Sequence, residues 1–159
     1  MSKSDCLKLV ECLKELNYTI ASMESCTAGA FPCEITNVPG ASAVLKESII
    51  TYSNEAKIKY GVPENIINEH GVYSLQTAIE MAKAIKINAN SDIGVGITGQ
   101  LGTVDTNNTC DKINHVWYAV VCPDGTINYE EIKVPEGDRG AQKNYVVERL
   151  AVLILESIS

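Results

Sequence analysis

The sequence predicts a single α/β domain of three layers (α/β/α), in which helices cover both faces of a mixed central sheet. Short runs rich in β-branched residues alternate with amphipathic helical patterns along the chain, and this alternation is typical of a sheet with helices on both faces. The turn signal Pro123-Asp124-Gly125 separates two adjacent strand patterns, so at least one strand pair is antiparallel. A chain of 159 residues can bury one substantial core. We therefore expect one domain over residues 1–159.

The first half of the chain begins with helix, strand and helix. An amphipathic helix is predicted over 3–16, because apolar residues recur there at helical spacing with Lys and Glu between them. A buried strand follows at 18–21, and a second helix is expected to start after Ser25. The β-branched residues of 44–52 predict the next strand.

The remaining elements follow from the same periodicities and from turn residues. The run SDIGVGI is short and apolar, which favours a central strand, and the stretch after it is rich in Gly, Thr and Asn, which favours a loop. In chain order the expected elements are a helix over 54–60, a turn at 63–69, a helix over 74–84, a strand over 91–97, a loop over 98–112, strands over 115–122 and 126–134, and a helix over 138–156.

Composition excludes several classes of partner. The chain has 13 basic and 20 acidic side chains, a formal charge of −7, so it lacks the basic surface that nucleic acid or an anionic membrane requires. No apolar stretch approaches the roughly 20 residues that span a bilayer, and the charged start does not resemble an export signal. Its six cysteines are scattered, without CxxC or zinc-ligand spacing. We expect a cytoplasmic protein with reduced cysteines, no metal and no cofactor.

A first polar cluster, Glu24-Ser25-Cys26-Thr27-Ala28-Gly29, stands where a strand should pass into a helix. A serine hydroxyl there lies near unpaired backbone N–H groups, which can stabilise an oxyanion or bind a phosphate. The same serine can also be a simple helix cap. Cys26 could be an activated thiolate at this helix start or an inert buried cysteine. The pattern alone leaves these alternatives open.

A second cluster joins Tyr52 at a strand end to Lys57 in the next helix. With Asn54 as the cap, Lys57 falls in the first helical turn, where a cation is disfavoured by about 0.3–1 kcal/mol. A lysine that acts as a base near pH 7 needs its pKa lowered by about 3 units, or roughly 4 kcal/mol. The helix dipole cannot supply this, so burial or a neighbouring cation must contribute. The alternative is a solvated surface lysine.

A third cluster follows the expected central strand and reads Thr98-Gly99-Gln100-Leu101-Gly102-Thr103. Its glycines would let a backbone approach a ligand closely, and Thr98 offers a hydroxyl. Arg139, after Gly137-Asp138, and Lys143 place two cations near the start of the last helix. Such a pair suits a phosphate or carboxylate, although a solvated helix face has the same pattern. His70 and His115 are isolated and are expected to be structural or on the surface.

In their order and spacing these clusters resemble the family of CinA C-terminal domains, which includes stand-alone nicotinamide-nucleotide amidohydrolases. The resemblance runs along almost the whole chain. Its motifs are Glu24-Ser25-Cys26-Thr27-x-Gly29, Val38-Pro39-Gly40-Ala41-Ser42, Thr51-Tyr52-Ser53-Asn54-x-Ala56-Lys57, Gly61-Val62, His70-Gly71-Val72-x-Ser74, Ala78-x-x-Met81-Ala82, Thr98-Gly99 and Gly137-Asp138-Arg139. The family's N-terminal molybdopterin-binding-like domain has no counterpart in this sequence.

The resemblance implies hydrolysis of the carboxamide of nicotinamide mononucleotide to nicotinate mononucleotide and ammonia. By position, Ser25 would be the nucleophile, Lys57 the base, and Tyr52 would position Lys57 or protonate the leaving ammonia. The substrate-binding residues implied in the same way are Glu24, Thr27, Gly29, Thr98, Gly99 and Arg139. No metal or organic cofactor is implied, and the family resemblance suggests a homodimer.

The chain departs from the family pattern at several loops. Ala28 replaces the first of two glycines, Glu47-Ser48 replaces another glycine pair, Gln100 to Thr103 alter a TGxAGP loop, and 111–114 replace a K-P-x-G stretch. Leu101 would narrow the pocket, and lost glycines would hinder close backbone approach. Two further functions therefore stay open: a non-catalytic nucleotide-binding or regulatory module, and an amidase for another small amide. A Cys26 thiol hydrolase is a more distant alternative.

Overall fold

The five-stranded sheet has the order β2-β1-β3-β4-β5. The computed structural model describes residues 4–102 and 112–159. Its strands are β1 (Ile20–Glu24), β2 (Leu45–Ile50), β3 (Ile93–Gly99), β4 (His115–Val121) and β5 (Ile127–Lys133), and its helices are α1 (Asp5–Leu16), α2 (Ala30–Thr36), the 3-10 helix η1 (Ala41–Ala43), α3 (Asn54–Lys59), α4 (Glu64–His70), α5 (Leu75–Ala89) and α6 (Arg139–Ile158). β1 is parallel to β2 and β3, whereas β4 pairs antiparallel with β3 and β5.

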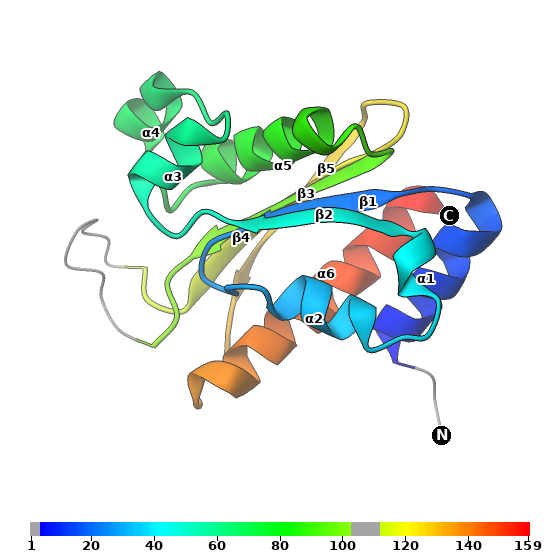
Figure 1. Cartoon of the computed structure of the whole chain (residues 1–159). Coiled ribbons are helices and arrows are strands. Elements are labelled where there is room, and N and C mark those ends of the chain that lie inside the picture. The colour runs from blue at the N-terminus through cyan, green and yellow to red at the C-terminus, as the bar shows by residue number, and fades with distance from the viewer. Residues whose placement is uncertain (1–3, 103–111) are drawn as a thin grey trace.

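The helices form a layer on each face of this sheet (Figure 1). Helices α1, α2 and α6 pack on one face around the larger core cluster, and α3, α4 and α5 lie on the other face. All residues of β1 and β3 are buried, as expected for parallel strands that helices cover on both sides. The predicted three-layer α/β fold with a mixed sheet is confirmed.

Helix α5 lies in backbone contact with β3 because two of that strand's glycines, Gly94 and Gly96, face the helix. A Cβ at Gly94 would lie 2.3 Å from the carbonyl oxygen of Ala82, and one at Gly96 would lie 2.2 Å from that of Ala78. These distances are too short for non-bonded atoms, so only glycine fits at either strand position. The two glycines therefore fix how closely the α5 layer approaches the centre of the sheet.

Side-chain caps fix where several helices begin. Each capping oxygen accepts a hydrogen bond from the N–H group three residues later, which satisfies an orphan donor of the first turn. The caps are Ser4 for α1, Ser53 for α3, Ser74 for α5 and Asp138 for α6. The predicted cap Asn54 is instead the first residue of α3. Lys57 therefore lies in the last turn of a six-residue helix, where the helix dipole no longer disfavours its charge.

Several predicted boundaries move in the structure. β1 runs over Ile20–Glu24 rather than 18–21, because its ladder with β2 and β3 continues to Glu24. The segment predicted as a turn at 63–69 forms α4. Helix α5 extends to Ala89, five residues beyond its predicted end, and stops at Asn90 in the left-handed conformation.

The start of the segment predicted as a loop over 98–112 also differs from prediction. Thr98 and Gly99 belong to β3 and pair with β4 rather than starting a loop. Residues 103–111, the centre of that predicted loop, lie outside the described residues. Within the described part of the chain, no helix has the length and apolar character needed to cross a bilayer.

Candidate active site

A five-residue turn after β1 presents Ser25. The N–H of Ser25 donates to the carbonyl of Ile97 at 3.0 Å, so Ser25 still belongs to the β1–β3 ladder. The chain then turns through Ala28 and Gly29, which have φ of 48° and 96°, before α2 begins at Ala30. Ser25 is therefore not the cap of the helix that follows. The sequence predicted a strand-to-helix junction here, but not the turn that separates the serine from the helix.

The buried side chain of Glu24 holds this turn together by accepting hydrogen bonds from it. Its Oε1 accepts hydrogen bonds from the Thr27 hydroxyl at 2.7 Å and from the Phe31 N–H at 3.1 Å. Burial raises the pKa of Glu24, against the opposing effects of these two donors, the Gly29 N–H and the charge of Lys143. The side chain is fully buried, and its Oε2 has no hydrogen-bond partner among the described residues. Glu24 and Thr27 thus shape the turn from inside the protein.

The hydroxyl of Ser25 meets the amine of Lys57. The Nζ of Lys57 lies 3.2 Å from the Oγ of Ser25 and donates to the carbonyl of Thr51 at 2.8 Å. Lys57 is 1 % exposed and Ser25 is 7 % exposed. Burial as such favours the neutral form of an amine. The pair therefore has the composition and separation of a nucleophile and its base.

The N–H groups that follow Ser25 in the turn differ in their hydrogen bonding. Ala28 and Ala30 donate to carbonyls within the turn. The N–H groups of Cys26 and Thr27 donate to no oxygen of the described residues. Two unpaired N–H groups directly after a nucleophile are the arrangement that stabilises a tetrahedral oxyanion.

Tyr52, the expected third member, is not brought to this pair. It is 66 % exposed and forms no hydrogen bond within the described chain. The reason is strand alternation: Thr51 and Tyr52 follow β2, and Thr51 points into the protein while Tyr52 points out. The sequence predicted that the Tyr52 phenol and the Lys57 amine face one spot, whereas Tyr52 is exposed and Lys57 is buried.

Thr98 and Gly99 lie beside Ser25 but are used internally. The hydroxyl of Thr98 donates to the carbonyl of Val72 at 2.7 Å, so it ties the end of β3 to the segment between α4 and α5. A Cβ at Gly99 would lie 2.5 Å from the carbonyl oxygen of His115. Gly99 is thus required for the close approach of β4. Neither residue offers an unused group to a ligand in this conformation.

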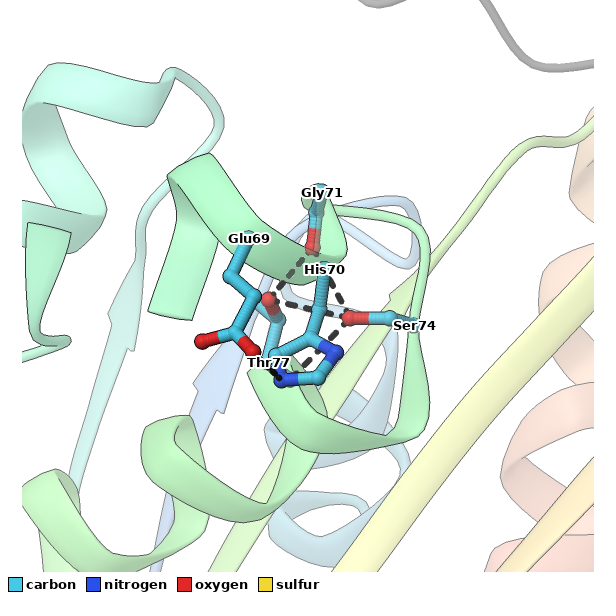
Figure 2. Close-up of polar contacts among 5 residues, drawn as sticks. All are labelled: Glu69, His70, Gly71, Ser74 and Thr77. Carbon is cyan, nitrogen blue, oxygen red and sulfur yellow. Dashed lines mark hydrogen bonds and ion pairs between the residues drawn. The ribbon is translucent and has the colours of Figure 1, made fainter. Parts of the chain in front are cut away.

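The segment between α4 and α5, whose Val72 carbonyl accepts the Thr98 hydrogen bond, is held by a small hydrogen-bond network (Figure 2). The hydroxyls of Ser74 and Thr77 both donate to the carbonyl of Gly71, at 2.8 and 2.7 Å. His70 stands at the edge of this network, 3.9 Å from the carboxylate of Glu69. Its position agrees with the surface role expected from the sequence. The motif His70-Gly71-Val72-x-Ser74 therefore builds the wall of the site behind Thr98.

The start of α6 brings cations to the same end of the sheet. Arg139 is the first residue of α6 and is exposed. Its Nε would lie 3.4 Å from a Cβ at Gly102, so it stands against the segment that follows β3. Lys143, one turn further, lowers the pKa of both Glu24 and Cys26 through its charge. The charge of Lys143 is therefore felt at the Ser25 turn, whereas the sequence indicated only a second cation on the helix.

Cys26 is held in its thiol form. Burial, followed by the negative charge of Glu24, raises the pKa of Cys26 to about 12. A thiol with so high a pKa is a poor nucleophile at neutral pH. The five described cysteines, Cys6, Cys12, Cys26, Cys33 and Cys122, are all free. The geometry gives no support to a thiol hydrolase.

Two departures from the family pattern lie in strand β2 and in the core. Ser48 is in the middle of β2, where its Oγ lies 2.7 Å from that of Ser22. Glu47 beside it is exposed on the same strand. Leu101 is 6 % exposed and packs in the core between the sheet and α6. Leu101 is thus a core residue, in a cluster against which Cys26 also packs.

The described residues also line a separate pocket of about 480 Å³, formed by Ile127, Asn128, Tyr129, Leu153, Glu156 and Ser157. It lies between β5 and the end of α6 and contains none of the predicted site residues. No group of three or more His, Cys, Asp or Glu side chains in the described ranges is arranged to hold a metal ion.

Comparison with known proteins assigns the chain to a family. The family model described as the CinA C-terminal domain matches residues 4–158. A CinA-like protein of Kosmotoga olearia is 36 % identical over 151 residues, which cover 94 % of this chain and 35 % of that protein. A CinA-like protein of Dictyoglomus turgidum is 38 % identical over 138 residues, which cover 86 % and 33 %. The chain thus spans about a third of the length of the relatives it matches.

Solved structures share the fold. The competence/damage inducible protein CihA from Agrobacterium tumefaciens superposes with a TM-score of 0.84 at 24 % identity, over 99 % of each chain. A CinA superfamily protein from Klebsiella pneumoniae gives 0.88 at 22 % identity, over 97 % of this chain and 95 % of that one. With the family match over nearly every residue, the conclusion is direct: this chain belongs to the CinA C-terminal domain family.

Proposed function

We propose that the chain is a serine amidohydrolase that hydrolyses the carboxamide of nicotinamide mononucleotide, giving nicotinate mononucleotide and ammonia. The observation that carries the proposal is the buried contact of 3.2 Å between Ser25 Oγ and Lys57 Nζ. The substrate follows from the resemblance of the motifs around these residues to those of nicotinamide-nucleotide amidohydrolases. A cation at Arg139 and another at Lys143, at the same end of the sheet, support an anionic substrate such as a nucleotide phosphate.

In the first half of the reaction, Ser25 Oγ attacks the carboxamide carbon and its proton passes to the neutral amine of Lys57. The carbonyl oxygen becomes an oxyanion, for which the N–H groups of Cys26 and Thr27 are the proposed donors. The C–N bond then breaks, the nitrogen takes the proton from Lys57, and ammonia leaves. Tyr52 is too exposed to supply this proton without turning inward, so the proposal assigns it to Lys57.

In the second half, water attacks the acyl-enzyme. Lys57 accepts a proton from the water and returns one to Ser25 Oγ as the acid is released. The carbonyl of Thr51, 2.8 Å from Nζ, keeps the amine directed at Ser25 through both halves. The cycle needs only groups of this chain and water.

The test is release of ammonia and nicotinate mononucleotide by the purified protein over a range of pH. Ser25→Ala is expected to abolish turnover with its melting temperature close to that of the wild type. Ser22→Ala is the matched control, because Ser22 is a buried serine of the same strand whose hydroxyl contacts Ser48 instead of Lys57. Retained turnover in Ser25→Ala would exclude this serine as the nucleophile.

Two other outcomes would point elsewhere. Binding of nicotinamide mononucleotide in calorimetry without any turnover would favour the regulatory or binding module. Turnover of another compound in a panel of small amides, with none of nicotinamide mononucleotide, would keep the amidase and change its substrate.

A further inference from the structure

Three hydroxyl-bearing residues form a row across the carboxyl ends of β2, β1 and β3. Glu24 pairs in register with Ile50 of β2 and with Ile97 of β3. Both ladders continue one residue further, since the Thr51 N–H donates to the Glu24 carbonyl at 2.8 Å and the Ser25 N–H donates to the Ile97 carbonyl at 3.0 Å. Ser25 therefore stands between Thr51 on one side and Thr98 on the other, with neighbouring strands about 4.8 Å apart.

The three side chains share one face of the sheet. Residues in register on parallel strands point to the same side, and every second residue along a strand does so too. Two residues before Thr51, Ile49 packs against the cluster that contains Met23 and the α5 side chains. Met23 in turn lies two residues before Ser25. Thr51 and Ser25 therefore face the side of the sheet that α3 covers with Lys57.

The hydroxyls at the two ends of the row differ in their use. Thr98 donates to the Val72 carbonyl, as described above. Thr51 is fully buried, and its Oγ1 has no hydrogen-bond partner among the described residues. Buried hydroxyls in native proteins are nearly always satisfied by protein, water or ligand. A valine of the same shape would avoid the cost of this unpaired group, so its presence beside a nucleophile points to a ligand.

The side of the site on which Thr51 stands identifies the atom it would contact. The proposed oxyanion donors, the N–H groups of Cys26 and Thr27, lie on the turn after Ser25. Lys57 must reach the leaving nitrogen to protonate it, and its Nζ is bonded to the carbonyl of Thr51 itself. The leaving nitrogen of the proposed mechanism therefore falls on the side of Ser25 where Lys57 and Thr51 lie.

We propose that Thr51 is a further catalytic residue of this site, whose hydroxyl oxygen accepts a hydrogen bond from the N–H of the leaving nitrogen of a primary carboxamide. The inference rests on the proposed amidohydrolase function and deepens it. Thr51 transfers no proton: the nitrogen takes its proton from Lys57, and Thr51 holds the nitrogen while the C–N bond breaks. An activated ester leaves as a phenolate, which needs no such bond, so the effect of Thr51 is specific to amides.

The experiment compares two substrates, nicotinamide mononucleotide and p-nitrophenyl acetate, with wild type and Thr51→Val. Both substrates use Ser25 and Lys57, and the valine keeps the main-chain carbonyl that bonds Lys57. We expect Thr51→Val to lose about 10- to 100-fold in kcat/KM for the amide, the range for loss of one buried hydrogen-bond partner, and less than about threefold for the ester. Thr51→Ser is expected to restore most of the amide activity.

Thr98→Val is the matched control, because it removes the hydroxyl at the other end of the row, which the structure uses internally. It is expected to lower the melting temperature and to affect both substrates equally. Thr51→Ala serves as a second hydroxyl-free variant if the valine does not fold. An equal loss on both substrates in either Thr51 variant, or no loss on the amide, overturns the inference and leaves the amidohydrolase standing. Absence of ammonia release from the wild type overturns both.

Discussion

The Oγ of Ser25 and the Nζ of Lys57 lie 3.2 Å apart, although 32 positions separate the two residues in the chain. Ser25 ends a central strand and Lys57 lies on a short helix attached to the edge strand β2. The carbonyl of Thr51 bridges the two elements by accepting a hydrogen bond from the amine. The proposed nucleophile and base are thus held by the sheet and the short helix beside it and depend on no long loop for their alignment.

Replacement of Lys57 tests the base. Lys57→Met keeps the length of the side chain and removes the amine, so we expect amide hydrolysis to fall by about 100-fold or more, the range of general-base catalysis. The melting temperature is expected to stay the same or to rise, because methionine removes a buried amine at a site that is 1 % exposed. Steady-state kinetics and thermal melts provide the two measurements.

Lys59→Met is the control for this variant. Lys59 belongs to the same helix but lies over the ring of Tyr60, 5.4 Å from its centroid, on the surface. Its loss is expected to leave amide turnover unchanged. A Lys57→Met protein as active as Lys59→Met would remove the base from the proposed mechanism.

The raised pKa of Glu24 predicts how stability changes with pH. Burial lifts the pKa of the folded state above its ordinary value of 4.5, so the folded protein keeps this proton at pH values where the unfolded chain has lost it. Stability from Glu24 is therefore fully present below about pH 4.5 and is lost as the pH rises towards the folded pKa. Glu24→Gln keeps an oxygen acceptor for Thr27 and removes the charge.

We expect the melting temperature of Glu24→Gln to exceed that of the wild type by a margin that grows as the pH rises from 4 to 8. Glu47→Gln, an exposed glutamate on β2, is expected to show no such growth. A margin that stays flat across this range would mean that burial does not govern the Glu24 carboxyl.

Cys26→Ala separates the serine from the thiol beside it. With a pKa of about 12, the Cys26 thiol is protonated at neutral pH, and the variant is expected to retain amide turnover within about threefold, which corresponds to less than 1 kcal/mol. Cys33→Ala, at an exposed position, provides the comparison. Loss of turnover in Cys26→Ala alone, with the fold preserved, would return the thiol to consideration.

Gly96→Ala tests the contact between α5 and β3. The added Cβ would lie 2.2 Å from the carbonyl oxygen of Ala78 and 2.6 Å from the N of Ala82, so the helix must move. We expect a loss of about 2–4 kcal/mol in the free energy of unfolding. Gly137→Ala, where a Cβ meets nothing within 4 Å, should change it by less than about 0.5 kcal/mol. Denaturant unfolding measures both, and equal values would show that α5 has room to shift.

The sequence predicted the fold because its periodicities are local. The apolar runs of β1 and β3 and the turn at Gly125 need no knowledge of distant residues. The predicted helix boundaries were less accurate where the helix's own side chains do not determine them. The short helix α4 was predicted as a turn. Helix α2 starts only after the turn that Glu24 holds by its hydrogen bonds. These boundaries depend on tertiary hydrogen bonds that no window of sequence contains.

The candidate site was partly predictable for the same reason. Motif spacing singled out Ser25 and Lys57, but only the strand register shows that Lys57 reaches Ser25 past Thr51. Tyr52 was predicted from its place at the strand end and from the family resemblance of its motif. The alternation of buried and exposed residues through 49–52 would have favoured Thr51.

The glycine contact between α5 and β3 also bears on how this scaffold could be redesigned. Because Gly94 and Gly96 accept no added side-chain carbon, the part of the sheet beneath α5 cannot be varied without moving the helix. Directed evolution therefore has little to gain there. The short helix α3, which carries Lys57, follows β2, an edge strand of the described sheet. More substitutions are tolerated there because one side of β2 pairs with no other strand in the described sheet. Libraries aimed at new amide substrates should therefore vary positions near β2 and leave the positions of β3 beneath α5 unchanged.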